Sequence, residues 1–239
     1  MPELKLKQKF QNILNDFIQS LQKAYKDELV SVILYGSAAS GEFIHRHSNL
    51  NLLVVLKNTD LENLKIASGL INKRKFRTVH PLFFTEEYIK NSSDVFPIEF
   101  LDMKENYTVL AGSDVLRDIS IDTRNLRFQC EQELKVKLIS LKQLFLRNNK
   151  DKAALKSLLF KSFTSVMHIL RNVIRLKGKQ PPYLKEDILK EVALEFQIDT
   201  NTWQKILAGK FKQIKLGGRE IEQLFIHFVR DLEEISEKV

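Results

Sequence analysis

The first quarter of the chain passes from a helical to a strand-like spacing of its apolar residues. Two short runs, LVSVILY at 29–35 and LNLLVVL at 50–56, are apolar at almost every position. We expect both to be strands that are buried on both faces. Residues 4–26, by contrast, are predicted to form an amphipathic helix, with an apolar face made of Phe10, Ile13, Leu14, Phe17 and Leu21.

The next segments alternate between helical and strand-like patterns up to about residue 103. Helices are predicted at 59–74, which begins with a Thr or Asp cap, and at 85–92, where a Thr cap precedes two acids. Strands are predicted at 76–84 and at 94–103. Because proline donates no backbone hydrogen bond, Pro97 is expected to place part of the last strand at an edge or a bulge.

From about residue 121 the apolar spacing becomes helical and stays helical to the end of the chain. About five helices are expected there, since Gly178 and two following prolines stop one of the longer stretches. We therefore predict two domains, an α/β domain at 1–120 and a helical bundle at 121–239.

Composition is typical of a folded, soluble protein, and a cytoplasmic location is expected. Apolar residues make up 44% and charged residues 28% of the 239 positions. Cys130 is the only cysteine, so no disulfide can form within the chain. The first residues contain no apolar signal segment, and no apolar run is long enough to cross a bilayer, so no membrane association is predicted.

The net charge of +8 lies entirely in the second half of the chain. Residues 1–120 carry 15 basic and 15 acidic side chains, whereas 121–239 carry 23 basic and 15 acidic ones. Lysine-rich solvated helix faces are the favoured interpretation, because the lysines are interleaved with glutamates. A contact surface for a protein partner is the alternative, and a nucleic-acid surface is the less favoured one.

The stretch LYGSAASGEFIHRHSNLNLLVVL, residues 34–56, carries the candidate chemistry. Gly36 can let the backbone approach a phosphate closely, and Ser37 can hold phosphate oxygens. Asn49 and Asn51 are two residues apart at the start of a strand, so they are expected on one face. In the loop between, two further candidates could contact phosphate, Arg46 and His47.

This arrangement resembles the nucleotidyltransferase motif of the polymerase-beta superfamily, in which Gly-Ser follows one strand and Asp-x-Asp opens the next. The resemblance covers residues 30–112, and the later helices are similar in architecture to the bundle of kanamycin-type and minimal bacterial nucleotidyltransferases. It implies a mixed sheet with flanking helices, followed by an all-α helical bundle.

The resemblance also implies which residues would hold metal. The two aspartates of active members bridge two Mg²⁺ ions that clamp the nucleotide phosphates. Here those positions are Asn49 and Asn51, and an amide brings no charge to a Mg²⁺ site. A third acid on a later strand would complete the site or act as base; Glu99 is the first candidate and Asp102 the second. Mg²⁺ is therefore expected to bind weakly or not at all, and to be required only if the site is active.

Three functional hypotheses follow. The leading one is a degenerate nucleotidyltransferase-fold protein that binds a nucleotide or other phosphorylated ligand through Gly36, Ser37 and neighbouring residues. The second is an active, metal-dependent nucleotidyltransferase that moves a nucleoside monophosphate to a hydroxyl. The third is an antitoxin-like or regulatory module that contacts a protein partner through its basic bundle.

Cationic side chains also recur at helical spacing within the predicted bundle. They are His168, Arg171 and Arg175. Either they form a polar outer stripe, or they face a cleft as bundle helices do in the family that the chain resembles.

Overall fold

The computed structural model describes residues 4–41, 43, 48–122 and 124–239. The chain divides into two compact units, Met1–Asp122 and Thr123–Val239. The division falls where the apolar spacing becomes uniformly helical. The first unit is built around a sheet, whereas the described residues of the second unit form helices and no strand.

A four-stranded mixed sheet forms the centre of the first unit. Its strands are β1 (Leu29–Tyr35), β2 (Leu50–Leu56), β3 (Val79–Phe84) and β4 (Tyr107–Gly112). The order across the sheet is β3-β2-β1-β4. β1 is antiparallel to both β2 and β4, whereas β2 and β3 are parallel. The mixed sheet implied by the resemblance is thus confirmed.

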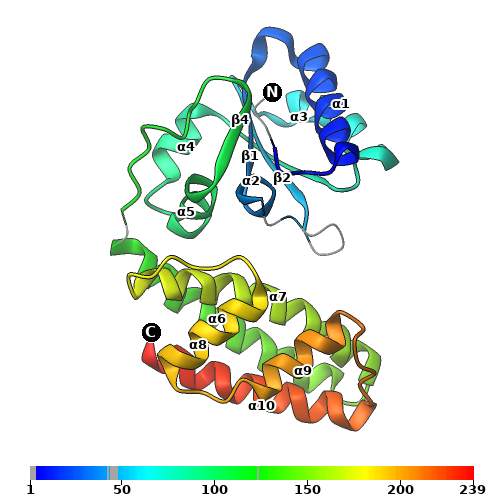
Figure 1. The fold of residues 1–239 in the computed structure, drawn as a ribbon, viewed down its shortest axis with the longest axis vertical. Coiled ribbons are helices and arrows are strands. Elements are labelled where there is room, and N and C mark those ends of the chain that lie inside the picture. Colours follow the sequence, from blue (N-terminus) through cyan, green and yellow to red (C-terminus); the bar gives the residue numbers. More distant parts are fainter. Residues whose placement is uncertain (1–3, 42, 44–47, 123) are drawn as a thin grey trace. The chain divides into compact units, whose positions relative to one another are not determined.

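Helices cover both faces of this sheet (Figure 1). On one side lie α1 (Gln8–Tyr25) and α3 (Leu61–Ile71), and on the other α4 (Glu86–Ser92) and α5 (Pro97–Glu105). The single turn α2 (Ser37–Ser40) follows β1, and two short 3₁₀ helices span Lys26–Glu28 and Arg74–Phe76.

Alternate residues of the central strands enter two separate apolar clusters, because successive side chains of a strand point to opposite faces. Leu34, Leu52 and Val54 pack with the α1 side. Ile33 and Leu53 pack with the α4 and α5 side. This double burial is what the two continuous apolar runs predicted.

Two predicted helix starts are realised by side-chain caps. The Asp60 carboxylate accepts a hydrogen bond from the Asn63 backbone N–H at 2.7 Å, and the Thr85 hydroxyl accepts one from the Tyr88 N–H at 3.0 Å. Each cap satisfies a backbone donor that the first helical turn leaves without a partner. The local sequence therefore decided where these two helices begin.

The strand predicted at 94–103 is wrong, because most of this segment forms α5. Pro97 is the first residue of the helix rather than a strand-edge residue. Its ring already has a helical φ, and its missing N–H has no partner at that position in any helix. The helix buries Ile98, Phe100 and Met103. The fourth strand instead comes from Tyr107–Gly112, which the sequence pattern did not single out.

The second unit contains five helices within its described residues, 124–239. They are α6 (Arg124–Asn148), α7 (Lys152–Leu176), α8 (Lys185–Phe196), α9 (Asn201–Lys210) and α10 (Gly218–Lys238). This is the all-α region that was expected. In the part of the chain that the structure describes, no helix is both long and apolar enough to cross a membrane.

Aromatic packing joins three of these helices. The Trp203 ring meets Phe228 edge-on with centroids 4.7 Å apart, and Phe163 lies 6.0 Å from Trp203. Trp203 is fully buried, and its indole Nε1 donates to the Asp231 carboxylate at 2.8 Å. Satisfying the one polar atom of this ring lets the whole side chain enter the core.

Gly112 ends β4 in a conformation that a side chain would not tolerate. Its φ is +78°, and a Cβ atom there would lie 2.0 Å from the Val30 carbonyl oxygen. We expect Gly112→Ala to lower the free energy of unfolding by about 3 kcal/mol, measured by urea denaturation. The matched control is Gly69→Ala in α3, where a Cβ meets nothing within 4 Å. That change should stabilise by about 0.5–1 kcal/mol; equal effects would contradict the close approach at Gly112.

Candidate functional site

The Gly-Ser turn joins the end of β1 to α2 and brings bare backbone against Asn51. Gly36 has φ +74° and ψ −149°, a conformation that is essentially restricted to glycine. Its N–H donates to the Asn106 carbonyl at 3.0 Å. A Cβ atom at Gly36 would lie 3.5 Å from the Asn51 Nδ2 atom. The turn and the second asparagine therefore meet, as the sequence motif predicted, and Ser37 follows as the first residue of α2.

A row of polar side chains crosses all four strands beside this turn. Asn51 pairs with Tyr35 of β1 and with His80 of β3, and Tyr35 pairs in turn with Tyr107 of β4. Directly paired residues present their side chains on the same face of a sheet. That face is the one covered by α4 and α5, since Tyr35 and Tyr107 pack against its apolar cluster. We call His80, Asn51, Tyr35 and Tyr107 the polar row.

His80 was missed by the sequence reasoning. The one signal in the sequence was a single histidine within an otherwise apolar strand segment. The sequence does not show which strand lies beside β2. His80 is exposed, Asn51 is half-buried, and Asn49 is exposed one residue before β2. Among the described residues, none of these three side chains has a hydrogen-bond partner. The exposed side chains of Asn49 and His80 are thus accessible to a ligand.

The candidates Arg46 and His47 lie outside the described residues. The donor set that is described does not fit a pair of Mg²⁺ ions, because Mg²⁺ is usually held through carboxylates. Asn49 and Asn51 supply neutral amides, and the neighbouring strand supplies an imidazole. Over the described ranges, no three His, Cys, Asp or Glu side chains are grouped so that they could hold a metal ion.

The two proposed third acids lie on α5 rather than on a strand. Glu99 and Asp102 are three residues apart in this helix, so they lie on neighbouring positions of its surface instead of opposite faces of a sheet. Burial, and then the charge of Asp102, raise the pKa of Tyr35 to about 12. Asp102 therefore acts electrostatically on the polar row, at the residue next to Asn51.

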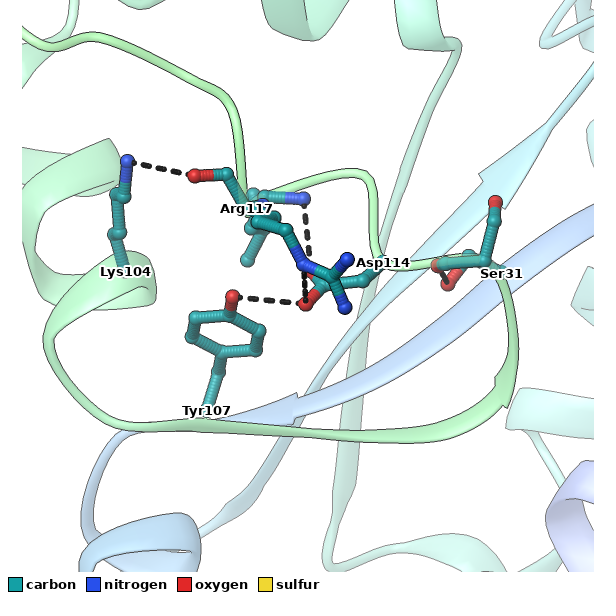
Figure 2. Close-up of polar contacts among 7 residues, drawn as sticks. Ser31, Lys104, Tyr107, Asp114 and Arg117 are labelled. Carbon is teal, nitrogen blue, oxygen red and sulfur yellow. Dashed lines mark hydrogen bonds and ion pairs between the residues drawn. The ribbon is translucent and has the colours of Figure 1, made fainter.

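The other end of the polar row is held by a structural network (Figure 2). The Tyr107 hydroxyl donates to the Asp114 carboxylate at 3.1 Å, and the Arg117 Nε atom lies 3.6 Å from the same carboxylate. The Lys104 ammonium donates to the carbonyl oxygens of Arg117 and Ile119. These bonds fasten the segment after β4 over the α5 side of the sheet, so the Asp114 carboxylate has a structural role.

A cavity of about 460 Å³ lies between α4 and the segment after β4. The polar residues that line it are Glu86, Lys90, Ser93, Ser113, Asp114, Asp118 and Ser120. α4 follows the end of β3 that is remote from His80, and Ser113 follows the end of β4 that is remote from Tyr107. The cavity is therefore separate from the Gly36 turn.

In the helical unit, Arg171 is part of the core rather than of a cleft or an outer stripe. It is 4% exposed, its guanidinium donates to the Pro181 and Pro182 carbonyls, and it lies 3.9 Å from the Tyr183 ring centre. Among the described helices, Lys185 and Lys210 are two cationic residues that are half-buried.

Burial lowers the pKa of both lysines, and the charge of Lys185 lowers that of Lys210 further. Lys210 donates to the Phe160 carbonyl at 3.0 Å. At Lys185 the charge of Glu186 acts in the opposite direction and raises the pKa.

Comparison with known proteins supports the same architecture. A crystal structure of the spectinomycin adenyltransferase AAD(9) from Enterococcus faecalis, with ATP and spectinomycin, superposes with a TM-score of 0.59 over 93% of this chain and 99% of that one. The chain has the nucleotidyltransferase fold. At 12% identity this likeness concerns the fold alone.

A shorter sequence match was found with a second protein. Over 47 residues this chain is 43% identical to a putative protein adenylyltransferase of Methanocaldococcus jannaschii. The match covers 20% of this chain and 31% of that protein. No family model matches the chain.

The electrostatic link between Asp102 and the polar row can be measured directly. Because the carboxylate raises the pKa of Tyr35, we expect Asp102→Asn to lower that pKa from about 12. The ultraviolet titration difference between each protein and its Tyr35→Phe derivative reports this group. Asp16→Asn, on α1 at the other face, is the control and should leave it unchanged. An unaltered Tyr35 titration in Asp102→Asn would show that the carboxylate lies away from the row.

The raised pKa of Tyr35 also predicts how the stability of the protein changes at high pH. The folded protein keeps a proton on Tyr35 that the unfolded chain loses near pH 10, so stability is full below pH 10 and falls as the pH rises toward 12. Tyr35→Phe should flatten this part of the profile, measured as the urea midpoint between pH 9 and 11.

Proposed function

We propose that the α/β unit binds a nucleotide or another phosphorylated ligand at the Gly36–Ser37 turn without carrying out metal-dependent nucleotidyl transfer. The proposal rests on one observation above all: the bare backbone of Gly36 lies against the amide of Asn51. A backbone without a side chain allows the close approach that a phosphate group requires. Ser37 directly after it supplies a hydroxyl.

The chemistry of the donor set supports the second half of the proposal. Two-metal transfer depends on carboxylates that hold the cations against the phosphates. Asn49 and Asn51 carry no charge, and His80 beside them is also no carboxylate. The charge of Asp102 acts on Tyr35, which is paired with Asn51 on the neighbouring strand. Asp102 would be the remaining acid for a residual activity.

The related proteins suggest which ligand to test first. The similar solved structure is an adenyltransferase with ATP, and the short sequence match is to a putative adenylyltransferase. An adenine nucleotide is therefore the ligand class that we propose.

Calorimetric titration with ATP, with and without Mg²⁺, tests the metal dependence. We expect Mg²⁺ not to strengthen binding, because the amides at 49 and 51 offer it no charge. A tenfold gain in affinity with Mg²⁺, about 1.4 kcal/mol, would mean that a working metal site survives. The active nucleotidyltransferase would then be the correct hypothesis.

Two substitutions test the turn itself. Gly36→Val should abolish ATP binding, because valine blocks the backbone approach and strains the turn, and Ser37→Ala should weaken it at least tenfold. Ser68→Ala on α3 is the control and should bind as the wild type does. Circular dichroism melting should show that the helical unit remains folded in every variant. Wild-type affinity in both turn variants would place the ligand elsewhere.

A further inference from the structure

The pairing of β2 with β3 identifies a third position in the candidate site. The resemblance implies a third acid on a strand after the Asp-x-Asp motif. In the sheet, the later strand that lies beside β2 is β3, and the residue paired with Asn51 is His80. The neighbouring pairs Leu50–Val79 and Leu53–Leu82 fix the register on either side. A shift by one residue would turn the whole strand over, so this placement is well determined.

Direction and accessibility agree with this placement. Leu50 and Leu52 flank Asn51 and enter the α1-side cluster, so Asn51 faces the other side, and His80 shares that face. Its side chain is exposed, and among the described residues it has no hydrogen-bond partner. The imidazole is therefore free to contact a ligand that reaches Asn51.

The side chains of Asn49, Asn51 and His80 share one chemical property. Each carries an N–H donor, the amide Nδ2 in the asparagines and a ring nitrogen in the histidine. Carboxylates at the same places would repel a phosphate and would need a cation between. Amide and imidazole donors can instead bond phosphate oxygens directly, and a chelated Mg²⁺ would occupy those same oxygens.

We propose that His80 is the third member of a carboxylate-free phosphate site with Asn49 and Asn51, and that this site binds the metal-free form of a phosphorylated ligand in preference to its Mg²⁺ complex. The preference for a metal-free ligand rests on the function proposed above. The position of His80 rests on the strand register alone.

Asp102 is the acid on this face whose charge acts nearest the site. It acts on Tyr35 of β1, which is one strand from Asn51 and two strands from His80. Glu99 is on the same helix, and Asp114 is bonded to Tyr107 and Arg117 at the far edge. Tyr35 and Tyr107 are uncharged near neutral pH, and their raised pKa values extend the uncharged state to higher pH.

The first experiment uses Mn²⁺ alone and tests the position of His80. The double variant Asn49→Asp with Asn51→Asp is compared with triple variants that add either His80→Asp or, as control, His227→Asp on α10. We expect Mn²⁺ to raise the melting temperature of the His80 triple variant at least twice as much as that of the double variant. Equal rises in the double and both triple variants would overturn the assignment of His80.

The second experiment uses ATP and tests the preference for a metal-free ligand. In EDTA, His80→Ala should bind ATP about tenfold more weakly than the wild type, while His80→Gln keeps a donor and should retain most of the affinity. Excess Mg²⁺ should weaken wild-type binding. Wild-type affinity in His80→Ala, or binding unchanged by Mg²⁺, would overturn the inference.

The two experiments separate the two proposals. If the wild type binds no ATP under either condition, the proposed nucleotide binding is wrong and so is the preference for metal-free ATP. The Mn²⁺ comparison then still decides whether His80 occupies the third position, because it needs no nucleotide.

Discussion

The register of β2 between β1 and β3 is the constraint on which the candidate site depends. β2 is buried on both faces, with no exposed surface on any side chain from Leu52 to Leu56. A slip by one residue would move every β2 side chain into the apolar cluster of the opposite face and turn Asn51 toward the α1 side. The apolar residues thus hold Asn51 against Gly36 on one side and beside His80 on the other. Packing of the strand, rather than attraction between the polar groups, brings them together.

The positive net charge of the chain does not lie in the unit that contains the proposed phosphate site. The positive excess lies in the helical unit, and residues 1–120 are balanced. The polar row itself consists of an amide, an imidazole and two tyrosines, and burial raises the pKa of Tyr35 so that it stays protonated. Hydrogen-bond donors rather than fixed charges are what this face offers. An anion would be bound there through directed bonds, which depend on geometry more than on ionic strength.

Two charged residues, Asp114 and Arg171, form contacts that stabilise the fold. The Asp114 carboxylate accepts from the Tyr107 hydroxyl and from two backbone N–H groups of its own turn. Arg171 joins α7 to the prolines that follow it, and the Tyr183 ring covers its guanidinium. Each contact satisfies a polar group that folding would otherwise leave buried without a partner. In both units, such contacts fasten irregular segments onto the regular elements.

The sequence by itself determined the local structure wherever one signal was unopposed. The runs at 29–35 and 50–56 became strands with those bounds, because apolar residues on both faces suit only a buried element. Caps at Asp60 and Thr85 started helices within a residue of the expected positions, since capping is a contact between residues three apart.

Tertiary structure decided what depends on distant segments. Pro97 suits a strand edge or a helix start equally well, and burial of Phe100 and Met103 against the sheet selected the helix. The sequence identified Gly36, Asn49 and Asn51 because they lie within one short motif. His80 lies 29 residues beyond Asn51 in the chain, and only the pairing of β3 with β2 makes them neighbours. Strand order is set by which faces can be buried together, a property of the whole unit that no local pattern contains.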